Sequence, residues 1–181
     1  MKRLGFLLGL GLILAAYANS LDNSFHFDDS HVIQTNLYLR SLDYAPRYFT
    51  DAHTFSSLPA NATYRPLVTL SLALDYARGA LNPRPYHVTQ LALLLATFAL
   101  LVVFFAPMIG EWQALFAATL FCMHTANTET MNLISARSEV LSTVGLLASF
   151  VLYQRSAVAR RTLLYLVPLA IGALAKAPLV V

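Results

Sequence analysis

Two adjacent carboxylates, Asp28 and Asp29, follow a long apolar segment near the N-terminus and are the first candidates for acid–base chemistry. The segment, residues 4–17, consists almost entirely of Leu, Gly, Ala and Phe. Carboxylates just past a membrane exit lie where water, a lipid head group and a second substrate can meet. Neighbouring side chains diverge by about 100° on a helix and point to opposite faces of a strand, so the two cannot share one task. We expect one to face the reaction and the other to cap a helix near Ser30; a solvated loop without chemistry is the alternative.

A second group of polar residues stands where two apolar segments meet. It contains His124 and Glu129, followed by Arg137 and Glu139. A charge at membrane depth costs about 2.5–3.5 kcal/mol on insertion scales, so such residues are candidates for function. The alternative is a solvated turn in which Arg137 pairs with Glu139.

Two isolated cations complete the candidate set. Lys176 is the lone charge in a C-terminal apolar run, and Arg65 stands directly before Pro66, a residue that suits the first turn of a helix. Either cation can bind a lipid phosphate; alternatively, Lys176 snorkels to the membrane interface and Arg65 pairs with a nearby carboxylate. The other histidines are scattered, and we interpret them as loop or interfacial residues: His26, His31, His53 and His87.

The composition of the 181-residue chain indicates a polytopic membrane protein. Hydrophobic residues make up 57% and charged residues only 12%, and the mean hydropathy is +0.60, whereas a soluble domain carries about 25% charged residues. The net charge of +3 comes with no basic run, which argues against nucleic acid as a partner. The single cysteine, Cys122, excludes an internal disulfide. The sequence has no zinc-type Cys/His spacing, Walker-type loop or GxGxxG motif.

Hydropathy predicts five membrane spans, measured against the roughly 20 apolar residues that cross a bilayer. The third and fourth are short for full crossings. The spans cover residues 4–20, 86–106, 111–124, 138–154 and 162–181.

The positive charges predict which side of the membrane each connection occupies. Lys2 and Arg3 precede the first span, and Arg155, Arg160 and Arg161 lie between the fourth and the fifth. Under the positive-inside rule both groups are cytoplasmic, which four intervening spans allow. The outer side then holds three polar regions, which we expect to converge on one face: the loop 21–85, the turn 124–139 and the residues near Lys176.

The outer loop has a predicted helix of its own over residues 66–81. Ser71, Asp75, Arg78 and Asn82 recur at spacings of four, three and four and form one polar stripe on an otherwise apolar helix. Such a helix is expected to lie in the membrane interface rather than to cross the bilayer.

The predicted architecture is an all-α polytopic membrane bundle of about five transmembrane helices with a long outer loop that contains interfacial helices. It divides into a first span (1–20), the outer loop (21–85) and the remaining spans (86–181). A cleaved signal peptide is the alternative for the first span. Because Val181 stands in an apolar run, we expect the chain to be the N-terminal part of a longer protein.

Taken together, the motifs resemble the GT-C superfamily of polytopic glycosyltransferases. Within it they are most similar to the transmembrane and tetratricopeptide-repeat O-mannosyltransferases and their bacterial relatives. The sequence departs from the family pattern at Thr125, where proline is usual, and at Ala177, where many relatives are acidic. The matching segments follow the family order: 17–21, 25–29, 54–59, 64–67, 74–76, 81–83, 124–129, 134–139 and 175–176.

This resemblance implies transfer of a sugar, such as mannose, from a polyprenyl-phosphate carrier to an acceptor hydroxyl, such as a protein Ser or Thr, on the outer (periplasmic or lumenal) face. A phosphate leaves without protonation, so one base and several cations suffice, unlike the carboxylate pair of glycosidases. Asp28 or Asp29 is then the base. The donor-binding residues by the same resemblance are Arg65, His124, Glu129, Arg137, Glu139 and Lys176.

The resemblance leaves three points open. Some GT-C enzymes use a divalent metal and others do not. The compact pattern favours a bacterial inner membrane, with the endoplasmic reticulum membrane as the alternative, and a repeat domain is expected beyond this chain. The competing function is a non-catalytic membrane scaffold or a transporter fragment. Transporters bind their substrates near the bilayer midplane, whereas the polar residues here stand at the span ends, which favours a transferase.

Overall fold

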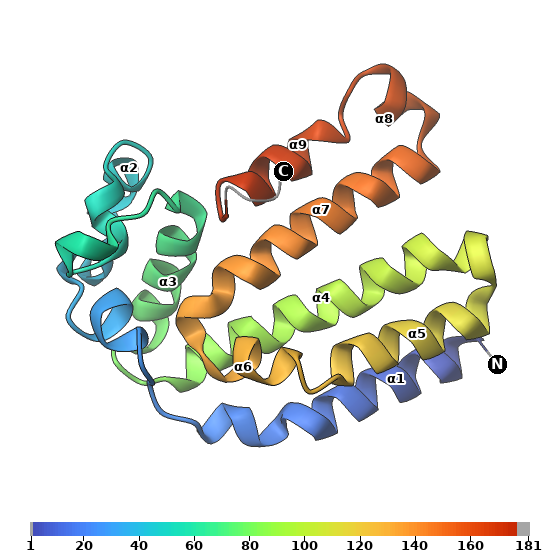
Figure 1. Ribbon diagram of the computed structural model, residues 1–181, viewed down its shortest axis with the longest axis horizontal. Coiled ribbons are helices and arrows are strands. Elements are labelled where there is room, and N and C mark those ends of the chain that lie inside the picture. The colour runs from blue at the N-terminus through green and yellow to red at the C-terminus, as the bar shows by residue number, and fades with distance from the viewer. Residues whose placement is uncertain (1, 177–181) are drawn as a thin grey trace.

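The computed structural model describes residues 2–176, which form helices and turns without a β-strand. Four longer helices lie side by side and run alternately in opposite directions (Figure 1). They are α1 (Lys2–Tyr17), α4 (Arg84–Ile109), α5 (Glu111–Met123) and α7 (Arg137–Arg155). The prediction of an all-α membrane bundle is confirmed.

Within the described residues, three helical segments are long and apolar enough to cross a membrane: Arg3–Asp22, Arg84–Ile109 and Ile134–Arg155. They correspond to the first, second and fourth predicted spans. The third corresponds to α5, which has only 13 residues. In the fifth, a turn leads from α8 (Ala157–Arg161) into the eight-residue α9 (Leu166–Ala173), and residues 177–181 lie outside the described part.

A sharp reversal joins α4 to α5. Pro107 near the end of α4 lacks an amide N–H, and α4 stops two residues later at Ile109. Gly110 follows with φ of +94°, a conformation that glycine adopts without a side-chain clash. The reversal brings the two helices alongside each other, and Phe98 of α4 and Ala118 of α5 belong to the same buried apolar cluster.

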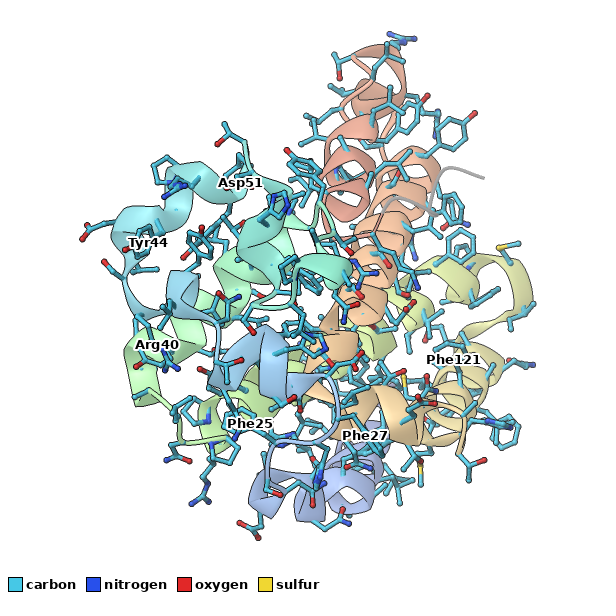
Figure 2. The ribbon with its side chains drawn as sticks, turned by 60° about the vertical axis from the view of Figure 1, so that its left-hand side comes forward. Phe25, Phe27, Arg40, Tyr44, Asp51 and Phe121 are labelled. Carbon is cyan, nitrogen blue, oxygen red and sulfur yellow. The ribbon has the colours of Figure 1, made fainter. Side chains whose placement is uncertain are left out.

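The outer loop forms a separate cluster of short helical turns at one end of the long helices (Figure 2). Its apolar core includes Ile33, Leu39 and Tyr48 and extends to Ile134 of the α6–α7 connection and Ala175 after α9. Burying a large apolar side chain stabilises by about 1.5–3 kcal/mol, which holds these short turns in place. The elements of the loop are Ala18–Asp22, Ser30–Gln34, Leu37–Arg40, Leu42–Tyr44, α2 (Ala45–Tyr48), Ala52–Phe55, Pro59–Asn61 and α3 (Pro66–Gly79).

The predicted helix at 66–81 is confirmed as α3, but the orientation predicted for its polar stripe is wrong. Asp75, at the centre of the stripe, is fully buried, and Ser71 is half-buried. Both accept hydrogen bonds from Arg137 of α7. This half of the stripe faces the protein because a buried cation satisfies it, whereas Arg78 and Asn82 remain exposed. Helix α3 buries apolar residues as well, among them Val68 and Leu72.

The predicted convergence of three polar regions on one face is confirmed. The C-terminal ends of α1, α5 and α9 and the N-terminal ends of α4 and α7 all lie at the end of the bundle that carries the outer loop (Figure 1). The turn between α5 and α7, with α6 (Asn127–Asn132), lies there too. Residues 150 positions apart in sequence therefore share one surface.

Candidate functional site at the loop end of the bundle

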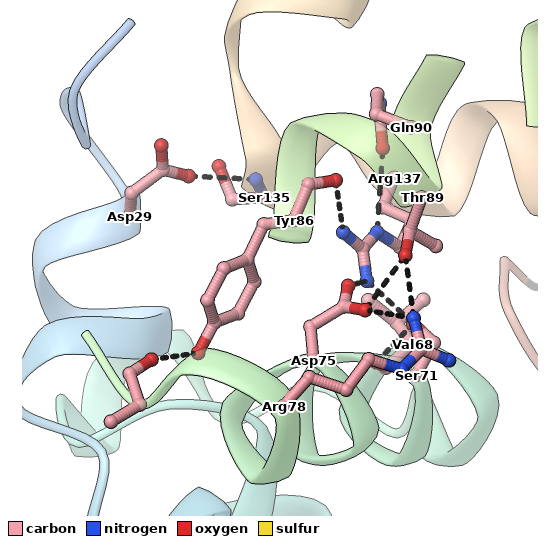
Figure 3. Close-up of polar contacts among 11 residues, drawn as sticks. Asp29, Val68, Ser71, Asp75, Arg78, Tyr86, Thr89, Gln90, Ser135 and Arg137 are labelled. Carbon is pink, nitrogen blue, oxygen red and sulfur yellow. Dashed lines mark hydrogen bonds and ion pairs between the residues drawn. The ribbon is translucent and has the colours of Figure 1, made fainter. Parts of the chain in front are cut away.

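The side chains of Asp28 and Asp29 lie in different surroundings, as their adjacency predicts. Asp29 is fully buried, and its carboxylate accepts backbone N–H bonds from Ser135 at 2.7 Å, from Ile134 at 3.4 Å and from His26 at 3.1 Å. Figure 3 shows the contact with Ser135. The expected cap at Ser30 is wrong: Asp29 satisfies the free N–H groups of a turn more than 100 residues later in the sequence, and so anchors the outer loop to the start of α7.

Asp28 points away from this anchor. A turn in which Asp29 and Ser30 donate their amides to the carbonyls of His26 and Phe27 separates the two carboxylates. Phe27 has φ of +43° there, a strained conformation for a bulky residue. The side chain of Asp28 remains 67% exposed.

Asp28 lines a hollow of about 270 Å³, which we call the Asp28 hollow. Arg65, the residue before α3, lines it as well. The guanidinium of Arg65 lies 5.1 Å from the centre of the Phe55 ring and donates to Ser138 Oγ at 3.2 Å. A carboxylate able to accept a proton and a cation able to bind a phosphate therefore share one cavity.

His31 also lines the Asp28 hollow, and the sequence analysis missed it. Its Nε2 lies 3.5 Å from a carboxylate oxygen of Asp28, and its Nδ1 lies 2.9 Å from Ser56 Oγ. The sequence did carry a signal for this contact. His31 stands three residues after Asp28, and that spacing brings two side chains together on a helical turn.

Arg137 does not reach the Asp28 hollow. Its buried guanidinium donates to Asp75, Ser71, the Gln90 side chain and the Tyr86 carbonyl (Figure 3). The ion pair between Arg137 and Glu139, the alternative raised by the sequence, does not form. The geometry gives Arg137 a structural position that joins α3, α4 and α7.

Glu139 and Lys176 form an ion pair at the same end of the bundle. Neither residue lines the Asp28 hollow; Glu139 lines a separate pocket, with Phe121 and Asn127. Because both side chains keep part of their surface exposed, they remain accessible to a ligand.

His124 and Glu129 lie apart from the residues that line the Asp28 hollow. His124 ends α5, and its Nδ1 accepts the amide of Ala126. It lines a mainly apolar groove of about 400 Å³ with Leu120 and Phe121. Glu129 is exposed on α6. Among residues 2–176, no three His, Cys, Asp or Glu side chains gather as a metal site.

The curated proteins similar to this chain include protein O-mannosyl-transferases of animals. The chain is 31% identical over 151 residues to Protein O-mannosyl-transferase TMTC2 of Homo sapiens, which covers 81% of the chain and 18% of the relative. It is 28% identical over 150 residues to human TMTC3, covering 81% of the chain and 16% of the relative. It is 28% identical over 171 residues to Protein O-mannosyl-transferase Tmtc1 of Drosophila melanogaster, covering 90% of the chain and 20% of the relative.

The chain thus spans about a fifth of the length of these relatives. No protein-family model and no solved structure matches it. The animal relatives do not support the expected bacterial origin. Relatives at 28–31% identity over 81% of the chain show that it is a homologue of the TMTC protein O-mannosyl-transferases, which are GT-C-type enzymes, over most of its own length.

Proposed function

We propose that the full-length protein containing this chain transfers mannose from a polyprenyl-phosphate carrier to a Ser or Thr hydroxyl of a protein. The observation that carries the proposal is the Asp28 hollow, where an exposed carboxylate and the Arg65 guanidinium meet at one end of a membrane helix bundle. The names of the relatives supply the sugar and the protein acceptor.

The residues of the Asp28 hollow suit a direct displacement. Asp28 accepts the proton of the acceptor hydroxyl as its oxygen bonds to the sugar carbon, and the bond from that carbon to the carrier phosphate breaks. The departing phosphate keeps the bond electrons and needs no proton, in contrast to the leaving group of a glycosidase. Arg65 stabilises its charge.

The remaining candidates have supporting roles in this proposal. Lys176, oriented by its ion pair with Glu139, binds the donor phosphate. His124 and Glu129 contact the lipid carrier, for which the apolar groove beside Phe121 offers a surface. Asp29 and Arg137 hold the outer loop on the bundle, because both are buried and bonded within the protein.

The proposed location is the endoplasmic reticulum membrane with the Asp28 hollow on the lumenal face. The animal origin of the relatives favours this membrane over a bacterial inner membrane. The positive-inside rule supports a cytoplasmic position for the arginines near α8, and thereby supports the lumenal side for the opposite end of the bundle, which carries Asp28.

The deciding experiment is the Asp28→Asn variant of the full-length protein, assayed in membranes with radiolabelled polyprenyl-phosphate mannose and an acceptor protein. The substitution preserves size and removes the base, so transfer is expected to fall about 10²–10⁴-fold. Asp43→Asn is the matched control, because Asp43 is an exposed loop carboxylate outside the Asp28 hollow. Near-normal transfer by Asp28→Asn would refute the assignment of the base.

A further inference from the structure

His31 is the best-connected side chain of the Asp28 hollow. Its side chain is only 12% exposed. Beyond the contacts with Asp28 and Ser56, its Nε2 lies 3.2 Å from the Nδ2 atom of Asn61. Ser56 is itself fixed, because its Oγ accepts the amide of Leu58 at 3.0 Å. The imidazole therefore stands in a frame supplied by the turn Pro59–Asn61 and the residues before it.

This frame can hold two protonation states. In the neutral imidazole one nitrogen donates and the other accepts. If the Asn61 amide donates to Nε2, then Nδ1–H donates to Ser56 Oγ, and the Asp28 carboxylate receives no hydrogen bond from the ring. In the imidazolium both nitrogens donate, and Nε2–H can bind the nearby Asp28 oxygen once the Asn61 amide has turned.

We propose that His31 is a positioning residue whose proton controls whether Asp28 is available as the base. Neutral His31 leaves the carboxylate free to accept a proton from a substrate hydroxyl. Protonated His31 binds the same carboxylate and withdraws it from the reaction. The inference rests on the proposed function, since it requires Asp28 to act as the base.

The charged groups around His31 are few. Of the residues that line the Asp28 hollow, Asp28 and Arg65 are the other ionisable ones. Asp29, although adjacent to Asp28, is buried against the backbone of Ile134 and Ser135. A change in the pH profile on substitution of His31 therefore reports mainly on its contact with Asp28.

The test compares pH profiles of mannose transfer by the full-length protein in membranes, with polyprenyl-phosphate mannose as donor. Wild-type kcat/KM is expected to fall as the pH is lowered from 7.5 to 5.5, because a growing share of the protein then carries the imidazolium that binds Asp28. His31→Gln keeps hydrogen-bonding groups but cannot gain a proton. Its activity at pH 7.5 should stay near wild type and fall less than about twofold at pH 5.5.

His53→Gln is the matched control, because His53 is an exposed loop histidine that contacts Asp51 and lies outside the Asp28 hollow. Its profile should equal that of wild type. If His31→Gln does not accumulate in membranes, Asn61→Asp provides the second test. It retains His31 and adds a carboxylate beside Nε2, which favours the imidazolium. The loss of activity on acidification should therefore begin at a higher pH than in wild type.

The proposal would be overturned if His31→Gln lost as much kcat/KM between pH 7.5 and 5.5 as wild type does. Where Asn61→Asp replaces it, a pH profile equal to that of wild type would overturn the proposal. This failure differs from failure of the proposed function. If Asp28→Asn is inactive while His31→Gln keeps the wild-type profile, Asp28 is the base and His31 does not control it. If Asp28→Asn is active, both assignments fail.

Discussion

Arg137 at the start of α7 donates a 2.5 Å hydrogen bond to Asp75 on α3, and each side chain is at most 1% exposed. The pair joins the outer loop to the membrane bundle. Removing two charges from water is costly, and the cost is offset only where good geometry and further hydrogen bonds accompany the pair. Gln90 and the Tyr86 carbonyl on α4 and the Thr89 hydroxyl supply those bonds.

Removing one partner of this pair should lower the free energy of unfolding far more than removing both charges together. Arg137→Met leaves Asp75 buried with only the exposed Arg78 as a cation and is expected to destabilise by about 3–5 kcal/mol. The double variant Arg137→Met with Asp75→Leu should recover most of the loss. Arg78→Met is the control and should cost less than Arg137→Met, because Arg78 is 61% exposed and Arg137 still pairs with Asp75. Unfolding of the full-length protein in detergent measures all three, and equal losses in the single and double variants would contradict the argument.

The packing of α9 on α7 predicts a sharp difference between two glycines. A Cβ atom at Gly145 would lie 2.6 Å from the Pro168 carbonyl oxygen and 2.7 Å from Gly172 Cα. Gly145→Ala should therefore cost about 1–3 kcal/mol by overpacking. At Gly11 a Cβ meets nothing within 4 Å, so Gly11→Ala should be neutral or stabilise by about 0.5–1 kcal/mol. Thermal unfolding midpoints in detergent test the pair, and equal midpoints would show that α9 does not pack closely here.

The membrane topology predicts opposite labelling of two exposed threonines. Thr50→Cys lies in the outer loop and Thr162→Cys directly after α8. In intact cells or sealed microsomes, an impermeant maleimide should label the two positions from opposite sides. The native thiol, Cys122, is buried and gives little background. Labelling of both positions from one side would refute the topology and the lumenal position of the Asp28 hollow.

Alkaline pH should loosen the outer loop through Tyr48. Burial raises the pKa of Tyr48 to about 12, and its hydroxyl donates to the Tyr38 carbonyl at 2.8 Å. In the unfolded chain the phenol ionises near pH 10, so the stabilisation is complete below about pH 10 and is lost as the pH rises through about 12.

Tyr48→Phe isolates this effect because it cannot ionise. It should be less stable than wild type at pH 8 by about 1 kcal/mol for the lost hydrogen bond. It should also lose less of its stability between pH 10 and 12. Limited proteolysis of the outer loop across this range provides the measurement, and parallel losses in both proteins would show that Tyr48 does not titrate as described.

The sequence by itself determined the features that depend on local pattern. Long apolar runs specified the helices α1, α4 and α7, because a helix in a bilayer must satisfy its own backbone hydrogen bonds. The adjacency of Asp28 and Asp29 was enough to predict that they diverge. The order of short motifs was enough to predict the homology with the O-mannosyl-transferases.

Only the tertiary structure decided which partner each polar side chain has. The stripe through Ser71 and Asp75 has the same spacing whether it faces water or a buried cation, and Arg137, more than 60 residues later, determines which. His31 became part of the Asp28 hollow because Ser56 and Asn61 fold over it. Such pairings depend on which helix faces dock, and periodicity along one segment carries no information about the segment that it meets.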